Sequence, residues 1–271
     1  MKFLRSFLAF IYVALIILLL LRCCGGCQRA ETPAPDTPEP APGDRPPVEI
    51  KESFKADVVM CIDITASMGA IINTIKENAL NFYPDLKARC LREGKEIKSM
   101  RISVIGFRDY EMPNPLDILN GYDTPPTPPF QQSGFFTMPT QENEFRTFVS
   151  NLQPIGGGDD PEAGYDALAI AFKSDWDRSD DVRQIVILWT DNPSHPTGRN
   201  ATVVGSFEEL TQLWYKMSRK NKRLFLFAPN EPTWETLVAK WDHTVRHDVS
   251  LGGGLTDVDY EDILRTLSES M

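Results

Sequence analysis

Three polar segments of the sequence carry side-chain oxygens that could bind a cation. Asp63, Thr65 and Ser67 stand at alternate positions, Asp159 follows three glycines, and Asp191 closes a strongly apolar run. Carboxylate and hydroxyl oxygens are the ligands that hard divalent cations prefer. We therefore take these five residues as candidate ligands of Mg2+, with Mn2+ or Ca2+ as alternatives.

Each segment also has a simpler explanation. Asp, Thr and Ser commonly cap the first turn of a helix, which would account for residues 63–67. Asp159 could be favoured by the dipole of the helix that follows it, and Asp191 could be a turn residue before Asn192. The hypothesis of a metal site therefore depends on whether the fold brings the three segments together.

The elements that carry these segments alternate between apolar strands and amphipathic helices. The expected strands are residues 56–63, 100–107, 135–138, 184–191, 223–228 and 245–249. The expected helices are residues 69–91, 141–152, 161–173, 207–220, 232–241 and 257–268, with Pro161 in the first turn of its helix. Central strands that are apolar throughout indicate a sheet covered on both faces.

This alternation predicts a doubly wound, mainly parallel α/β sheet with helices on both faces, a Rossmann-like arrangement. In such folds the binding sites form at the carboxyl ends of the strands. All three polar segments stand at such ends or at the helix starts beside them. We expect residues 63–67 to form an extended turn that directs Asp63, Thr65 and Ser67 to one side.

Four ordered stretches resemble the von Willebrand factor type A domain and its metal-ion-dependent adhesion site. They are Asp-Ile-Thr-Ala-Ser-Met (63–68), Ile-Gly-Phe-Arg-Asp-Tyr (105–110), Gly-Gly-Gly-Asp-Asp-Pro-Glu-Ala (156–163) and Thr-Asp-Asn-Pro-Ser-His (190–195). The resemblance covers essentially residues 54–270. It implies that the Thr65 and Ser67 hydroxyls touch the metal, and that Asp63 and Asp191 act nearby, directly or through water.

The resemblance also implies a function. The metal would keep one coordination position for an Asp or Glu side chain of a protein partner, so we expect a protein-binding module and not an enzyme. The family commonly has Thr where this chain has Asp159. A directly bound Asp159 carboxylate would hold the ion more tightly and leave less positive charge for an acidic partner.

Three charged or polar residues within these stretches are expected to support the site without binding the metal. Arg108 and Asp109 follow the second strand, and we expect them to pair and brace the site from behind. His195 follows Asp191 closely, and we expect it to order the loop after that residue.

The amino-terminal 47 residues differ in composition from the rest of the chain. Residues 1–30 contain an apolar run, residues 7–21, flanked by basic residues, which predicts a signal sequence or a membrane anchor. Cys27 follows two glycines and is a candidate for lipid attachment, with an uncleaved anchor as the alternative. Residues 31–47 contain seven prolines and predict an extended linker before a domain at 48–271.

These features predict a membrane-anchored chain whose domain faces the extracytoplasmic side, either the periplasm or the cell surface. Cys61 and Cys90 lie within the predicted domain and are expected to be buried thiols, with a disulfide between them left open.

The charge balance bears on the class of partner. The formal net charge is -10, and beyond residue 30 the chain has 24 basic against 38 acidic residues. Nucleic acid is a poor partner for such a surface, because phosphate binding depends on clustered Lys and Arg. Two alternatives to a binding module remain: a metal-dependent hydrolase that uses the same carboxylates, and a structural domain with a non-functional metal site.

Overall fold

The computed structural model describes residues 48–70, 72–110, 119, 129–157, 161–218, 220–251 and 260–270. The predicted anchor at 1–30, Cys27, the linker at 31–47 and Asp159 lie outside the described residues. Residues Val48–Met271 form one compact unit.

The core of this unit is one seven-stranded sheet with the order β3-β2-β1-β5-β6-β7, in which β4 also pairs with β2. The strands are β1 (Glu52–Asp63), β2 (Lys95–Phe107), β3 (Phe130–Gln132), β4 (Phe136–Met138), β5 (Val182–Trp189), β6 (Lys222–Pro229) and β7 (Thr244–Val249). The five long strands are parallel, and only β3 and β4 run antiparallel, both against β2. The predicted doubly wound, mainly parallel sheet is confirmed.

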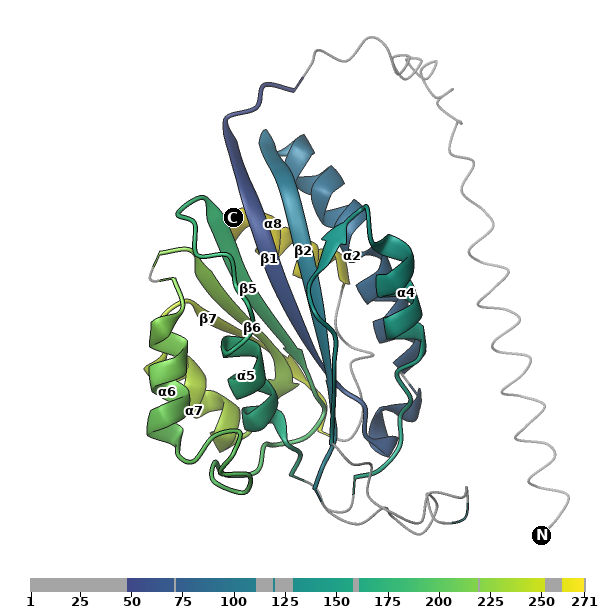
Figure 1. The fold of residues 1–271 in the computed structure, drawn as a ribbon, viewed down its shortest axis with the longest axis vertical. Helices are drawn as coiled ribbons and strands as arrows, with labels where there is room; N and C mark the ends of the chain where they lie inside the picture. The colour runs from purple at the N-terminus through teal and green to yellow at the C-terminus, as the bar shows by residue number, and fades with distance from the viewer. Residues whose placement is uncertain are drawn as a thin grey trace, which may run out of the picture. The chain divides into compact units, whose positions relative to one another are not determined.

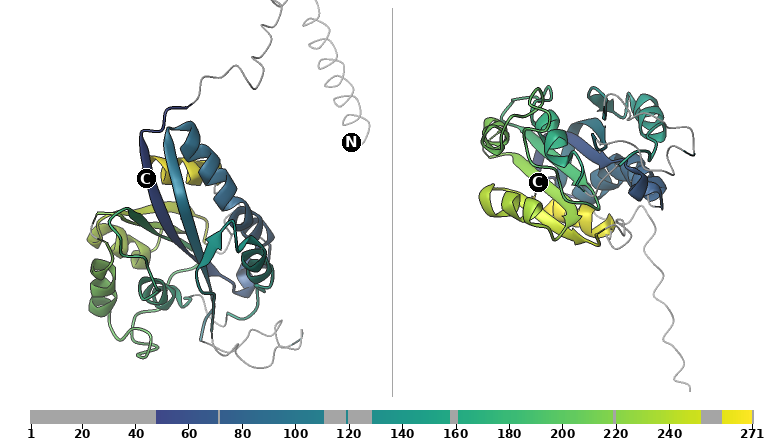
Figure 2. Two further views of the ribbon diagram at one scale, coloured as in Figure 1. Left: turned by 45° about the horizontal axis from the view of Figure 1, so that its top comes forward. Right: turned by 90° about the horizontal axis from the view of Figure 1, so that it is seen from below.

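Helices cover both faces of the sheet (Figures 1 and 2). The helices are η1 (Ala66–Ala70), α2 (Ile72–Arg92), α4 (Glu142–Ser150), α5 (Gly164–Phe172), α6 (Phe207–Lys216), α7 (Pro232–Lys240) and α8 (Tyr260–Ser270). Helices α2, α4 and α8 pack on one face, and α5, α6 and α7 pack on the other. Each face therefore has its own apolar cluster.

Strand β1 shows how the sequence produces these two clusters. Successive side chains of a strand point to opposite faces. Met60 and Ile62 accordingly belong to the cluster under α2, while Val59 and Cys61 belong to the cluster under α5. Since both faces are buried, the strand must be apolar throughout, and this is the pattern that the sequence shows.

Two local expectations were wrong. Helix α5 begins at Gly164, so Pro161 is not in its first turn. Glu162 instead pairs with Ser194 in a parallel bridge, and this contact competes with helix formation there. Residues 66–70 form a 3-10 helix ahead of α2, so the segment after Asp63 is not an extended turn.

The described cysteines are free and buried. Cys61 is in β1 and faces α5, whereas Cys90 belongs to α2 on the opposite face of the sheet, so no disulfide joins them. In the part of the chain that the structure describes, no helix is both long enough and apolar enough to cross a membrane.

We predict that Cys61 and Cys90 resist alkylation in the folded protein. Burial raises the pKa of the Cys90 thiol to about 11 and raises that of Cys61 further, and the thiolate is the reactive form. Iodoacetamide labelling mapped by mass spectrometry should modify both residues only after denaturation. Rapid labelling of Cys61 without denaturant would contradict the two-face arrangement.

Candidate metal site

The first polar segment folds back on itself at the carboxyl end of β1. The Asp63 carboxylate accepts hydrogen bonds from the backbone N–H of Thr65 (2.9 Å) and from its hydroxyl (2.7 Å). This is the turn that an Asp side chain forms with the residue two positions ahead. The Thr65 hydroxyl lies 3.0 Å from that of Ser67, at the start of η1. The three side chains therefore converge through a tight turn and not through extended alternation.

Strand β5 brings the third segment to the same place. Ile62 is opposite Trp189 in the parallel pairing of β1 with β5, so Thr190 and Asp191 follow directly beside Asp63. The Thr190 hydroxyl donates to Asp63 Oδ2 (2.7 Å), and the Ser67 hydroxyl donates to Asp191 Oδ1 (3.2 Å). Sheet register thus joins residues that are more than 120 positions apart.

The glycine loop, residues 153–157, closes the site from the side of β2. Its backbone is held by hydrogen bonds from Ile155 N to Ile64 O (3.1 Å) and from Ala66 N to Gly156 O (2.9 Å). Gly157 has a φ of +94°, and a Cβ there would stand 3.2 Å from the Thr65 Cβ and 3.4 Å from Glu162 Oε1. Glycine therefore suits both the backbone conformation and the limited space at this position, which lies close to both Thr65 and Glu162.

Burial sets the electrostatics of the site. Asp63 and Asp191 are fully buried. The pKa of Asp63 is raised to about 7, with desolvation as the largest cause and the charge of Asp191 as a smaller one, while the bonds from Thr65 and Thr190 oppose the rise. Burial also raises the pKa of Asp191, while the bond from Ser67 lowers it. Two carboxylates held this close would be stabilised by a cation.

The residues present fit a hard divalent cation. Asp191 Oδ2 is buried and has no hydrogen-bond donor among the described residues. Thr65 and Asp191 are buried while Ser67 is exposed, so the cluster is open to solvent on one side only. Carboxylate and hydroxyl oxygens with one position left open are ligands suited to Mg2+, Mn2+ or Ca2+.

Four of the five predicted site residues come together: Asp63, Thr65, Ser67 and Asp191 are joined by hydrogen bonds. The fifth, Asp159, lies outside the described residues. In the part of the chain that the structure describes, no group of three or more His, Cys, Asp or Glu side chains is arranged to hold a metal. The cluster therefore relies on hydroxyl oxygens as well as on carboxylates.

Sequence reasoning did not assign roles to Thr190 and Glu162. Thr190 supplies a donor to Asp63, and its place at the end of an apolar strand beside Asp191 was a usable signal. Glu162 is buried and lies near Thr65, and Asn192 donates to it (3.4 Å). Only the bridge between Glu162 and Ser194 brings it to the site, and that bridge had no signal in the sequence.

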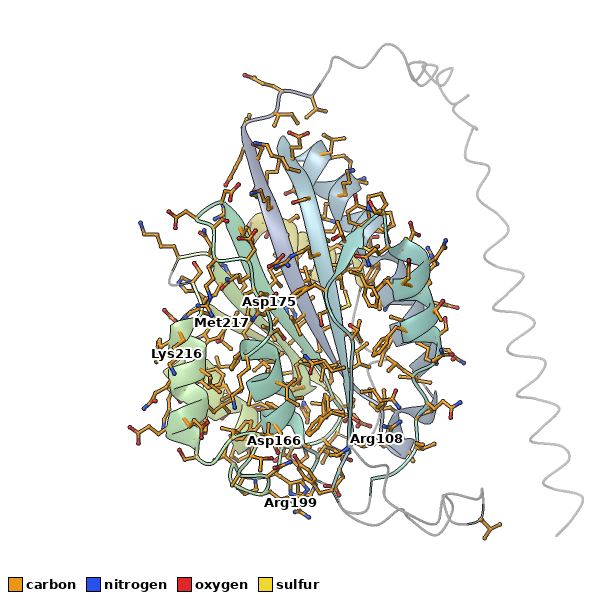
Figure 3. The ribbon with its side chains drawn as sticks, viewed as in Figure 1. Arg108, Asp166, Asp175, Arg199, Lys216 and Met217 are labelled. Carbon is orange, nitrogen blue, oxygen red and sulfur yellow. The ribbon has the colours of Figure 1, made fainter. Side chains whose placement is uncertain are left out.

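The two residues expected to brace the site each bind a different loop. Arg108 is buried, and its guanidinium donates to Ile155 O and Gln153 O (3.0 Å each). Asp109 lies 2.6 Å from His195 Nε2. Figure 3 labels Arg108, Asp166 and Arg199 toward the end of the sheet where β1, β2 and β5 finish.

The mainly parallel seven-stranded sheet with helices on both faces has the Rossmann-like arrangement that the sequence predicts. No family model matches the sequence, and no curated protein matches it. The chain is similar to several solved structures.

One is proximal thread matrix protein 1 from the mussel byssus, at 14% identity and a TM-score of 0.48, over 82% of this chain and 47% of that one. The same protein is also described with a zinc occupied MIDAS motif, at a TM-score of 0.46. Another is the vWF domain of the type V pili tip protein Mfa5 from Porphyromonas gingivalis. It is 19% identical with a TM-score of 0.36, over 54% of this chain and 42% of that one.

A third is the pilus adhesin SpaC from Lactobacillus rhamnosus GG, at 12% identity and a TM-score of 0.45, over 80% of this chain and 30% of that one. This chain therefore spans less than half the length of each of these proteins. At such identities and scores, the similarities carry no conclusion about function.

We predict that Asp63→Asn changes how the stability of the metal-free protein depends on pH. The folded pKa of about 7 exceeds the ordinary value of 3.8. The stability that Asp63 contributes is therefore full below the ordinary value and is lost as the pH rises through the folded one. In EDTA, the variant should unfold at a higher temperature than the wild type at about pH 8, with the gap closing toward about pH 5.

Differential scanning calorimetry across this range measures the effect. A difference between wild type and variant that stays constant with pH would contradict the assignment of a desolvated Asp63.

Proposed function

We propose that this chain is a divalent-metal-dependent, protein-binding module, tethered to a membrane by its amino-terminal segment and facing the extracytoplasmic side. One observation carries the proposal: Thr65, Ser67 and Asp191 converge at the carboxyl edge of the sheet, where a buried oxygen of Asp191 has no donor among the described residues. The apolar run at residues 7–21 supports the tether.

The residues at this site would have two roles, binding the cation and orienting its ligands. The Thr65 and Ser67 hydroxyls and Asp191 Oδ2 would hold the cation, and Mg2+ suits these oxygens best. Asp63 would orient the Thr65 hydroxyl through its 2.7 Å hydrogen bond. When bound, the cation supplies an electrophilic position that a carboxylate can occupy.

An acidic group of a protein partner is the expected ligand for that position. Ser67 is exposed, so a partner can approach from its side of the cluster. Asp63 and Asp191 place two buried carboxyls at the site. Because they offset much of the charge of a divalent ion, we expect the chain to bind the metal more tightly than it binds the acidic partner.

A metal-dependent hydrolase is the alternative. Such enzymes commonly use two metals held by a larger set of acidic or imidazole ligands. The described residues include no group of three or more His, Cys, Asp or Glu side chains suited to a metal. Turnover of phosphatase and peptidase substrates by the purified protein would favour the hydrolase over a binding module.

We predict that Thr65→Ala and Ser67→Ala each weaken Mg2+ or Mn2+ binding by about tenfold or more, because each removes an oxygen ligand. Isothermal titration calorimetry measures the affinity. Thr147→Ala is a matched control, since this hydroxyl bonds only within α4, to Asn143 O (2.8 Å). Equal heats of metal binding for the wild type and Ser67→Ala would contradict the metal site. If neither ion raises the unfolding temperature of the wild type, a structural domain with a non-functional metal site is favoured.

We also predict that partner capture depends on the metal. The full-length chain, incubated with a membrane extract, should retain a protein partner in Mg2+ and release it in EDTA. Ser67→Ala should capture less than Thr147→Ala does. Retention that is equal in EDTA and in Mg2+ would contradict metal-dependent binding.

A further inference from the structure

Asp109 and His195 form a buried pair next to the site that the proposed function does not use. The side chains of both residues are at most 4% exposed, and Asp109 Oδ1 lies 2.6 Å from His195 Nε2. On the other side of the ring, Arg199 Nη1 lies 2.9 Å from His195 Nδ1. A guanidinium can only donate, so Nδ1 is the acceptor, and Nε2 carries the hydrogen that is donated to Asp109. In this hydrogen bond His195 is therefore the donor and Asp109 the acceptor.

The backbone of His195 connects this pair to the glycine-loop side of the site. His195 N donates to Glu162 O (2.8 Å), and Glu162 N donates to Pro193 O (2.9 Å). The Ser194 hydroxyl accepts from Tyr165 N (2.8 Å) at the start of α5. Residues 193–195 and 162–165 are thus held together in register. Asp191 precedes one of these segments by two residues, and Glu162 belongs to the other.

Strand β2 holds both segments from its carboxyl end. The Asp109 carboxylate also accepts from Tyr110 N (2.6 Å), which fixes its orientation. The carbonyl of Arg108 accepts from Ala163 N (3.1 Å), while its guanidinium binds Ile155 O and Gln153 O. Two consecutive residues therefore contact the loop after β5 and both ends of the segment between Gln153 and Ala163.

Stability alone is a poor account of this arrangement. Burying a charged group costs desolvation energy, and an apolar replacement of similar size is often neutral or stabilising. A buried polar network instead fixes one geometry, because each group must keep its partner. This network lies where three loops meet and not within either apolar cluster.

We propose that Asp109 and His195 are positioning residues for the candidate cation site. Their hydrogen bond holds the loop that follows Asp191 against the end of β2, and the same end of β2 binds Ala163 N in the segment that carries Glu162. This would keep Asp191 in place beside the Ser67 hydroxyl. The inference rests on the proposed metal-binding function. It assigns no contact between either residue and the cation.

Three variants of the full-length chain test the role. His195→Ala removes the donor to Asp109, and Asp109→Ala removes the acceptor. His195→Gln keeps an N–H donor at a reach similar to that of Nε2, so it should restore the bond to Asp109. Mn2+ is the probe, with affinity from isothermal titration calorimetry and stability from thermal unfolding in EDTA.

Asp57→Ala is the matched control. Asp57 is a buried carboxylate of β1 that binds Arg101 through two hydrogen bonds (2.8 and 2.5 Å) and accepts from Asp177 N. It stands six residues before Asp63, roughly 20 Å along the strand at the usual rise per residue. Its loss should lower the unfolding temperature without changing the affinity for Mn2+.

We expect His195→Ala and Asp109→Ala to bind Mn2+ about tenfold more weakly than the wild type, a loss typical for residues that orient metal ligands. His195→Gln should recover most of that affinity. Wild-type affinity in His195→Ala, or an equal loss in Asp57→Ala, would overturn the positioning role while leaving the metal site in place. No binding of Mn2+ by the wild type would overturn the metal site and the positioning role together.

Discussion

The burial of two neighbouring carboxyls, Asp63 and Asp191, is the constraint on which the rest of the site depends. Like charges in a desolvated place repel each other, and burial raises the pKa of both groups. The hydroxyls of Thr65, Thr190 and Ser67 donate to them and offset part of this cost. One oxygen of Asp191 is still without a donor among the described residues, and a cation would complete the arrangement.

The parallel sheet makes this burial possible. Adjacent parallel strands end at one edge, so β1 and β5 deliver Asp63 and Asp191 side by side from distant parts of the sequence. The helices on both faces exclude water from the strands up to that edge. The tight turn after Asp63 then places hydroxyls above the carboxyls, and Ser67 keeps the cluster open to solvent.

The end of β2 gives the surrounding loops their geometry. Arg108 binds the start of the glycine loop, and Asp109 binds the loop after β5 through His195. Loops are usually the most variable parts of a fold, yet here buried polar contacts connect them to a central strand. The proposed cation ligands and the proposed positioning residues are therefore separate sets of residues, so a loss of positioning can be distinguished from a loss of the metal site.

The sequence by itself determined the architecture and most of the site. Apolar strands and amphipathic helices predicted the layers, because a strand buried on both faces must be apolar throughout. The polar ends of those strands predicted Asp63, Thr65, Ser67 and Asp191. The tight turn at Thr65 became visible only in the tertiary structure. The same is true of the bridge between Glu162 and Ser194, which stands where the sequence predicted the first helical turn at Pro161. The tertiary structure also separated the roles of Arg108 and Asp109. The Glu162–Ser194 bridge and the Asp109–His195 contact join residues far apart in sequence, and local propensity carries no information about such a partner.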